Sequence, residues 1–366
     1  MRVPRVLILT ASVGEGHDLP ARTLAAQLRL ECPDVEVVTE DGLVPMGRLI
    51  TMISADSGRI VFFRFQWLWD VGFWFFAGSR PTRSVSQALL ARLGGGGLMR
   101  LIERVDPDVI VSTYPNTTEV LSRLRRSQRI RVPVCSAITD LSALHYWASP
   151  GVDIHLVAYP QSIDEVRKIA GQATRVFSVQ GLTAPDFLAP RGQEDARSAL
   201  SLPSAGKVVL VSGGGWGVGD LVGAVEAALA ESAVTRVVCL CGRNSALLAR
   251  LNDRFSADGR VRIEGFSDQM SEWMAAADVL VHSTGGLTVL EALMRGLPAI
   301  SYGWGRGHIR LNNAAFERFA LAEVAPSREG LRAALRRALE RERTSGDEFR
   351  ALPSAASFVL AAAQTA

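Results

Sequence analysis

Short runs of β-branched and aliphatic residues alternate with longer helical stretches in both halves of this chain, and no other feature restricts its fold as strongly. Such alternation is typical of βαβ units that build parallel sheets. We therefore expect an α/β protein with two doubly wound, Rossmann-like domains that face a cleft and bind ligands at the carboxyl ends of their strands. The expected strands are residues 5–9, 35–39, 108–112, 132–138, 154–157, 175–179, 207–212, 236–241, 260–265, 278–282 and 298–302.

The chain has 366 residues, which exceeds the length of one ordinary domain. A polar stretch with prolines, residues 183–204, is the expected linker. We expect residues 1–185 to form the first domain and residues 205–345 the second. Residues 346–366 are expected to form a C-terminal helix that returns to the first domain.

Net charge and cysteine content indicate which partners and which cellular compartment to expect. The formal net charge is only +3, so we expect no nucleic-acid partner. The four cysteines, Cys32, Cys135, Cys239 and Cys241, form no CxxC pair, which fits a reducing compartment. The chain begins with a strand-like run and not with a cleavable leader. We therefore expect a cytoplasmic protein.

Residues 60–78 interrupt the alternating pattern with nine of the chain's 25 aromatic residues. Arg64 and Asp70 break the apolar run, so a membrane-spanning helix is a poor explanation. Trp and Phe beside Arg are typical of segments that lie in the headgroup region of a membrane. We expect residues 59–83 to contact an anionic membrane, and an ordinary buried helix is the alternative.

The first strand leads into a turn of small residues that ends in a histidine. Gly14 and Gly16 precede His17, and glycines allow a ligand to approach the backbone closely. An imidazole at such a strand-to-helix junction can act as a general base near neutral pH. A structural histidine at the start of a helix is the alternative.

Two glycine-rich turns follow strands in the second half, at residues 213–219 and 283–286. Backbone N–H groups ahead of a helix favour a diphosphate leaving group. Neither turn is a GxGxxG or a GxxxxGK[ST] motif, which argues against dehydrogenases and P-loop NTPases. Thr288 and Glu291 also match a capping box, so Glu291 is either a ligand residue or a structural one. We expect no metal, since Asp106-Pro-Asp108 reads as a helix end followed by a strand.

Taken together, these segments resemble the diacylglycerol glycosyltransferases of glycosyltransferase family 28. That group includes the monogalactosyldiacylglycerol synthases and the processive diacylglycerol glucosyltransferases, and MurG is a more distant relative. The resemblance covers most of residues 5–325 and rests on the order and spacing of short motifs. These are Gly14–His17, Pro107–Pro115, Thr139–Trp147, Ser212–Gly215, Cys241–Asn244, Gly265–Met270 and Gly285–Ala292.

The resemblance implies an inverting enzyme of the GT-B fold. It would move a hexose from a UDP-sugar to a hydroxyl of a diacylglycerol-like lipid at the inner face of the cell membrane, without a metal or other cofactor. His17 would be the base or an acceptor contact. Asp140 would either orient His17 or take the proton itself. The other acceptor residues would be Gly14, Gly16, Pro115, His145 and Trp147.

The donor residues implied by the resemblance all lie in the second half. Glu291 would bind the ribose hydroxyls, and residues 265–270 would hold the uracil. The full set is Gly213, Gly214, Gly215, Arg243, Asn244, Phe266, Met270, Ser283, Thr284, Gly285, Gly286, Thr288, Glu291, His308 and Arg310.

Two departures from the family pattern leave the donor sugar open. The family's Lys/Ser-Pro before the paired glycines is Ser283-Thr284 here, and its Pro-Gly-Gln-Glu-x-x-Asn loop is Arg306–Asn312. The sequence does not distinguish galactose, glucose and N-acetylglucosamine as the donor sugar. His308 and Arg310 could suit an acidic sugar. Competing functions are a transferase for soluble natural products, a sugar-nucleotide epimerase and a nucleotide-sugar-binding regulator without turnover.

Overall fold

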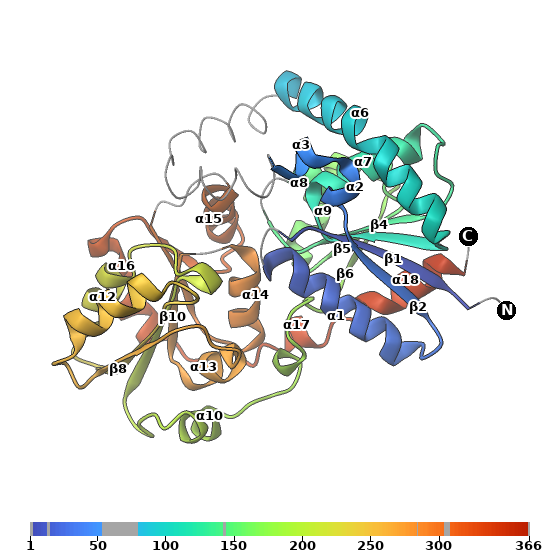
Figure 1. Cartoon of the computed structure of the whole chain (residues 1–366). Coiled ribbons are helices and arrows are strands. Elements are labelled where there is room, and N and C mark those ends of the chain that lie inside the picture. The colour runs from blue at the N-terminus through green and yellow to red at the C-terminus, as the bar shows by residue number, and fades with distance from the viewer. Residues whose placement is uncertain are drawn as a thin grey trace. The chain divides into compact units, whose positions relative to one another are not determined.

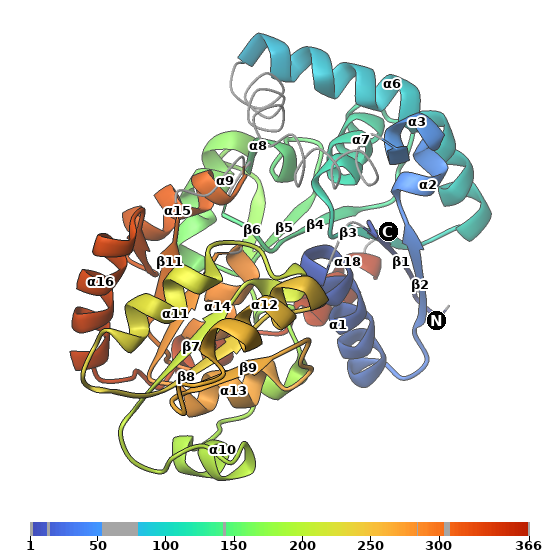
Figure 2. The same ribbon diagram turned by 60° about the vertical axis from the view of Figure 1, so that its left-hand side comes forward.

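The computed structural model describes residues 3–12, 15–52, 80–141, 144–283, 285–303 and 308–364. The chain divides into two compact units, each described by itself below (Figures 1 and 2). Unit 1 contains residues 1–183, 306–308 and 351–366, and unit 2 contains residues 184–305 and 309–350.

Unit 1 is built on a six-stranded parallel sheet with the order β2-β1-β3-β4-β5-β6. Its strands are β1 (Arg5–Thr10), β2 (Glu36–Asp41), β3 (Val109–Ser112), β4 (Val134–Ile138), β5 (Ile154–Val157) and β6 (Arg175–Ser178). Its helices are α1 (Glu15–Glu31), α2 (Leu43–Met46), α3 (Arg48–Thr51), α6 (Arg80–Val105), α7 (Pro115–Arg126), α8 (Leu144–Trp147), η3 (Pro160–Ser162), α9 (Ile163–Ala170) and α18 (Ala355–Ala363).

Helices cover both faces of this sheet because alternate side chains of each strand point to opposite sides. Val6 and Ile8 of β1 pack in one cluster with α1 and α18. Leu7 and Leu9 pack in a second cluster with α2, α6 and α7. The last helix of the chain, α18, therefore lies in unit 1 and contacts α1 (Figure 1).

Helix α6 contains four consecutive glycines, residues 94–97, although glycine weakens a helix interior. Packing against α2 explains two of them. A Cβ atom on Gly94 would lie 2.8 Å from Cε of Met46, and one on Gly97 would lie 1.6 Å from the backbone oxygen of Pro45. The glycines therefore let α6 approach α2 more closely than any other residue would allow.

Unit 2 is built on a second six-stranded parallel sheet, with the order β12-β11-β10-β7-β8-β9. Its strands are β7 (Lys207–Ser212), β8 (Val234–Leu240), β9 (Val261–Glu264), β10 (Val279–His282), β11 (Ala299–Tyr302) and β12 (Glu323–Ala325). Its helices are η4 (Pro185–Phe187), α10 (Gln193–Ala199), η5 (Gly214–Trp216), α11 (Leu221–Leu229), α12 (Ser245–Phe255), α13 (Met270–Ala276), α14 (Gly286–Met294), α15 (His308–Arg318), α16 (Arg328–Glu340) and α17 (Asp347–Arg350).

All eleven strands expected from the sequence are present, and β12 is an additional edge strand. Sequence analysis missed β12 because it spans only three residues, Glu-Val-Ala, which is too short to show a period.

The stretch expected to be a linker, residues 183–204, belongs to unit 2 from residue 184 onward. Arg197 of α10 is buried, and it donates hydrogen bonds to Oδ2 of Asp278 at 2.7 Å and to the carbonyl of Ala276 at 3.0 Å. The same Asp278 oxygen accepts the backbone N–H of Val208 at 2.7 Å. A buried charge pair needs such a complete set of hydrogen bonds, and this one attaches the segment to the second sheet.

Candidate active site

In each sheet the strand order reverses at one position, and ligands in doubly wound folds bind beside this reversal, at the carboxyl ends of the strands. The reversal in unit 1 lies between β1 and β3, and that in unit 2 lies between β7 and β10. His17 follows β1 and Thr113 follows β3. Gly213 follows β7 and Ser283 follows β10. Three sequence-based candidates, His17, Gly213 and Ser283, therefore lie at the two places where this topology favours a ligand.

The imidazole of His17 is held in one tautomer by the backbone. Its Nδ1 lies 3.0 Å from the carbonyl oxygen of Thr113, which can only accept a hydrogen bond. Nδ1 therefore carries the proton, and in the neutral ring Nε2 keeps a lone pair. Thr113 is fully buried, and its hydroxyl donates to the carbonyl of His17 at 3.2 Å. His17 is half-buried, and its role as a base stays a prediction.

Aromatic side chains from two other elements surround this imidazole. Tyr114 lies edge-on, with ring centroids 4.9 Å apart, and Trp147 of α8 lies with its ring centroid 6.1 Å away. Both aromatic residues are buried. Sequence analysis identified Trp147 but missed Thr113 and Tyr114 as individual residues. Their role depends on the pairing of β1 with β3, which no local pattern reveals.

Asp140 follows β4, the strand next to β3, and is half-buried. Its Oδ1 accepts the backbone N–H of Leu141 at 2.9 Å. Since the Thr113 carbonyl already fixes Nδ1 of His17, a role for Asp140 in orienting the imidazole through that nitrogen is unnecessary. Its role as the base stays a prediction.

The remaining acceptor candidates differ in their surroundings. Pro115 is the half-buried first residue of α7, and His145 of α8 is exposed. Gly16 is exposed, and a Cβ atom there would meet nothing within 4 Å. Nothing steric therefore requires a glycine at residue 16. Gly14 lies outside the described residues.

The glycine-rich turn after β7 is largely bonded within itself and to its neighbours. The N–H groups of Gly213 and Gly214 donate to the carbonyl of Leu240 and to Oγ of Ser212, at 3.4 and 3.2 Å. The carbonyl of Gly215 accepts the N–H of Arg243 at 2.8 Å. Of the three glycines, only Gly215 keeps an N–H group without a partner among the described residues.

The turn after β8 packs directly on this glycine-rich turn. Gly242 has a positive φ of 58°, and a Cβ atom there would lie 2.3 Å from the carbonyl oxygen of Gly214. Arg243 follows, and its guanidinium carbon lies 3.8 Å from the ring centroid of Phe266. Phe266 is 51% exposed, so the pair forms a flat, accessible surface of the kind on which a nucleobase can stack.

Two donor candidates lie at helix starts beside this surface. Asn244 caps α12, and its Oδ1 accepts the N–H of Leu247 at 3.0 Å. That bond gives Asn244 a structural role in the protein without ligand. Met270 is the half-buried first residue of α13.

The turn after β10 places a helix start at the reversal in unit 2. Gly285 is the N-cap of α14 and has no side-chain cap, and Gly286 is the first helical residue. Oγ of Ser283 donates to the carbonyl of Tyr302 at 3.1 Å. Thr284 lies outside the described residues. The N-terminal end of a nine-residue helix favours an anion, because the helix dipole is positive there.

The capping-box interpretation of Glu291 is wrong. It requires Thr288 to be the N-cap, but the N-cap is Gly285, and Thr288 lies inside α14. Glu291 is the sixth residue of that helix and is buried, with 8% of its surface exposed. The carboxylate of Glu291 therefore needs another explanation, and the ribose role stays a prediction.

A further polar residue lies beside this helix start. The side chain of Asn312 is fully buried, and neither its Nδ2 nor its Oδ1 has a hydrogen-bond partner among the described residues. Its Nδ2 lies 3.7 Å from the position of a Cβ atom on Gly285. An unsatisfied buried amide costs stability, so Asn312 is a strong candidate for ligand contact. The neighbouring Asn313 accepts from Oγ of Ser301 at 2.7 Å and is structural.

Two more donor candidates begin α15. Arg310 is exposed. The side chain of His308 lies outside the described part of the chain.

Within the described residues, no group of His, Cys, Asp and Glu could hold a metal ion. No helix within those ranges is both long and apolar enough to cross a membrane.

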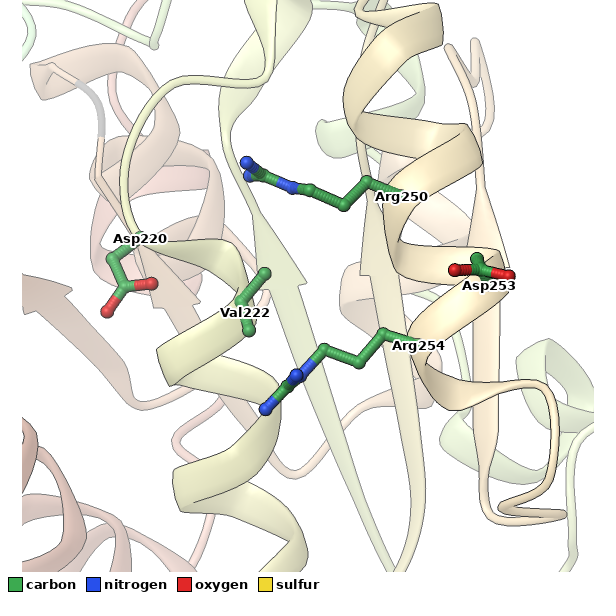
Figure 3. Close-up of a pocket in the computed structure, with 5 residues that line it drawn as sticks. All are labelled: Asp220, Val222, Arg250, Asp253 and Arg254. Atoms are coloured by element: carbon green, nitrogen blue, oxygen red, sulfur yellow. The ribbon is translucent and has the colours of Figure 1, made fainter.

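A surface hollow of about 620 Å³ lies between α11 and α12. Figure 3 shows Arg250 and Arg254 extending from α12 toward Asp220 and Val222. Asp220 already caps α11 through Gly223, and it accepts the hydroxyl of Tyr302 at 3.0 Å. We assign no ligand to this hollow.

Comparisons with known proteins agree with these observations. Residues 17–183 match the family model for monogalactosyldiacylglycerol (MGDG) synthase, and residues 208–365 match that for the glycosyltransferase family 28 C-terminal domain. The processive diacylglycerol beta-glucosyltransferase of Staphylococcus aureus (strain MRSA252) is 26% identical over 330 residues, which covers 89% of this chain and 82% of the relative.

Solved structures share the fold at low identity. MurG of Acinetobacter baumannii is 15% identical, with a TM-score of 0.60 and full coverage of both chains. The spinosyn rhamnosyltransferase SpnG is 15% identical, with a TM-score of 0.62 and coverage of 99% and 100%. One SpnG structure contains thymidine diphosphate. The two parallel sheets with flanking helices are thus those of the GT-B fold.

Proposed function

Because residues 17–183 match the family model for monogalactosyldiacylglycerol synthase and residues 208–365 match that for the family 28 C-terminal domain, we propose that this hexosyltransferase glycosylates a diacylglycerol-like lipid. The donor is a UDP-sugar, no metal or other cofactor takes part, and the anomeric configuration inverts. Transfer takes place at the inner face of the cell membrane, where the acceptor lies. Residues 59–83 contact the membrane. Most of this segment, residues 59–79, lies outside the described part of the chain.

The main structural support for this proposal is the tautomer of His17, in which Nδ1 is protonated. In the reaction, Nε2 of His17 takes the proton of the acceptor hydroxyl, and the oxygen attacks the anomeric carbon from the side opposite the nucleotide. The bond between that carbon and the phosphate oxygen breaks, and UDP leaves with the bonding electrons. Single displacement of this kind inverts the configuration. Asp140 is the alternative base.

The start of α14 supports the donor half of the proposal. The positive end of its helix dipole would stabilise the charge that develops on the leaving diphosphate. The Arg243–Phe266 surface would hold the base, Glu291 the ribose and Asn312 the diphosphate or sugar. Gly213, Gly214, Gly215, Thr284, Gly286, Thr288, His308 and Arg310 complete the proposed donor set.

The test is a matrix of donors and acceptors, with labelled sugar as the readout. Donors are the UDP-activated forms of glucose, galactose, N-acetylglucosamine and glucuronic acid, with dTDP-rhamnose for comparison. Acceptors are diacylglycerol in mixed micelles and a panel of soluble aglycones. We expect a UDP-sugar to label diacylglycerol and to raise the melting temperature of the protein. Labelling of the soluble aglycones alone would contradict a lipid acceptor. A rise in melting temperature with UDP-sugars, without any sugar transfer, would indicate a regulator.

A further inference from the structure

Glu119 of α7 is a buried carboxylate that the proposed reaction does not use. Its side chain is only 6% exposed. Oε1 accepts a hydrogen bond from Nε of Arg123 at 2.8 Å, and Oε2 accepts one from Nε2 of Gln87 at 3.0 Å. Burial raises the pKa of Glu119, and the bond from Arg123 opposes this shift. A carboxylate in such a place has to be held by hydrogen bonds, and Gln87 supplies one of them from another helix, α6.

The amide of Gln87 joins three helices. Besides its bond to Glu119, Nε2 donates to the carbonyl oxygen of His145 in α8 at 3.3 Å. A carboxylate and a carbonyl oxygen both only accept, so they fix the orientation of the amide and use both hydrogens of Nε2. Helix α7 contacts both α6 and α8, and Figure 2 shows the three helices over the same face of the first sheet. Gln87 therefore lies where α6, α7 and α8 meet.

Helix α8 depends on such contacts because it is a single turn. A helix of four residues does not hold its own conformation. Trp147 packs in a hydrophobic cluster that includes residues of α9. Helix α6 adds polar contacts, since Gln87 reaches the carbonyl of His145 and Oγ of Ser86 lies 3.2 Å from the hydroxyl of Tyr146. Loss of the bond at His145 therefore loosens the attachment of α8 to α6.

The position of α8 matters for the site because Trp147 lies beside His17. The two ring centroids are 6.1 Å apart, and the indole is buried. Protein interiors are close-packed, so a displaced helix moves the side chains that it buries. A shift of α8 therefore changes the surroundings of the His17 imidazole.

We propose that Gln87 is a positioning residue of this enzyme. It attaches α8 to the buried carboxylate of Glu119, and α8 in turn keeps Trp147 beside the imidazole of His17. The inference rests on the proposed function, in which His17 takes the proton of the acceptor hydroxyl. Gln87 acts through α8 and not through contact with a substrate. Its loss therefore weakens use of the acceptor and leaves donor binding unchanged.

The test compares variants of the whole protein. Gln87→Met keeps the length of the side chain but removes both N–H donors, whereas Gln87→Lys supplies donors again. An exchanged pair, Gln87→Glu with Glu119→Gln, still joins α6 to α7 through an amide and a carboxylate, but residue 87 then has no donor for α8. Gln27→Met is the matched control, because Gln27 is a half-buried glutamine of α1 that accepts from Oγ of Ser354 at 3.3 Å.

The first measurement needs no turnover. It is the NMR signal of the His17 ring in protein that carries isotopes in histidine alone, and His17→Ala assigns this signal among the five histidines. Ring protons shift with the position of nearby aromatic rings, so Trp147→Leu gives the reference for a displaced indole. We expect Gln87→Met and the exchanged pair to move the His17 signal in the same direction as Trp147→Leu. Gln87→Lys and Gln27→Met should leave it in place.

The second measurement is sugar transfer to diacylglycerol in mixed micelles. We expect kcat/KM for diacylglycerol to fall at least about fivefold in Gln87→Met and in the exchanged pair, which is the factor that one neutral hydrogen bond is worth. The affinity for UDP-sugar, measured by calorimetry, should keep its wild-type value. Gln87→Lys and Gln27→Met should transfer sugar as wild type does.

An unchanged His17 signal in Gln87→Met would overturn the proposal. An equal loss of kcat/KM in Gln27→Met would also overturn it, because the effect would then come from general destabilisation. Full activity of the exchanged pair would do the same, because the bond between α6 and α7 would then suffice. If Gln87→Met does not fold, the exchanged pair and Gln87→Lys decide by the same two measurements. If no protein transfers sugar to diacylglycerol, the proposed function is wrong, and the His17 signal still decides whether Gln87 holds α8.

Discussion

His17 is positioned by a backbone carbonyl, which has consequences for mutagenesis. The Thr113 carbonyl accepts from Nδ1 whatever side chains surround it, so substitution of acidic neighbours should not change the tautomer. An imidazole with a fixed tautomer loses little entropy when it abstracts a proton, because no reorientation is needed.

Replacing His17 should therefore affect the chemical step and little else. General-base assistance is worth about 10²–10⁴ in rate, so His17→Ala should lower kcat by about that factor. The affinity for UDP-sugar should stay near the wild-type value, because the proposed donor residues all lie in unit 2 or at the start of α15.

Asp140→Asn is the comparison for this experiment. If kcat falls as far in Asp140→Asn as in His17→Ala, Asp140 is the better candidate for the base. Retention of more than about a third of wild-type kcat by His17→Ala would be far from the loss expected of a base. In that case the histidine is structural.

Glu291→Gln separates binding from structure at the second reversal. The substitution keeps the shape of the side chain but removes the charge of a proposed bond to ribose, and charge-assisted bonds are the stronger ones. We expect UDP affinity, measured by calorimetry, to fall about tenfold, while the melting temperature changes little. Equal affinity with a lower melting temperature would mean that the buried carboxylate serves the fold alone.

Asn312→Leu tests the unsatisfied amide. Replacing an unpartnered buried amide by an apolar side chain of similar size should leave stability unchanged or raise it by about 1 kcal/mol. If a ligand normally satisfies the amide, the same variant should bind the UDP-sugar more weakly. Asn313→Leu is the matched control, and it should lose stability because Ser301 then lacks its partner. Wild-type affinity in Asn312→Leu would exclude the amide from the donor site.

His155 gives unit 1 a pH dependence that is independent of catalysis. It is fully buried, accepts the N–H of Ser149 at Nε2, and burial lowers its pKa from 6.5 to about 4. As the pH falls, the unfolded state binds the proton first, so stability present above pH 6.5 is lost toward pH 4.

Between pH 7.5 and pH 5 the protonation of His155 should remove about 2 kcal/mol from the free energy of unfolding. Urea titrations at the two pH values measure the loss, and His155→Gln should reduce it by that amount. If the free energy of unfolding of His155→Gln falls between the two pH values as far as that of wild type, His155 has the same protonation state in the folded and the unfolded protein.

Among the elements, α6 shows how a helix can tolerate four glycines. Gly97 faces the backbone of α2, whereas a Cβ atom on the exposed Gly96 would meet only Nη1 of Arg100, at 3.9 Å. Gly97→Ala should therefore lower the free energy of unfolding by about 1–3 kcal/mol through overpacking. Gly96→Ala should be neutral or stabilise by up to about 1 kcal/mol, since alanine favours a helix. Equal melting temperatures for the two variants would mean that α6 and α2 do not pack closely.

At the scale of the whole molecule, both units repeat one arrangement. Each parallel sheet reverses its strand order once, and His17 in unit 1 and the two glycine-rich turns in unit 2 lie just after strands at the reversals. The chain also passes between its units more than once, and its last helix, α18, returns to unit 1, as expected from the sequence. The place of α10 in unit 2 is not apparent from the polarity of residues 183–204.

The sequence by itself determined the strands, the parallel α/β class and the glycine-rich turns, because each depends on a local period or on a residue type within a few positions. The motif pattern also predicted the similarity to the two family models that match the chain. At Glu291 local sequence left two interpretations open, and the structure excludes the capping box because Thr288 lies inside a helix that starts earlier.

Only the tertiary structure decided which residues meet. The partner of His17 lies 96 residues away and is set by the register of β1 and β3. The attachment of α10 depends on a buried ion pair across 81 residues, and the amide of Asn312 became a candidate only because packing buries it without a partner. Contacts over such separations follow from strand order and from the packing of whole faces, which no short segment of sequence specifies.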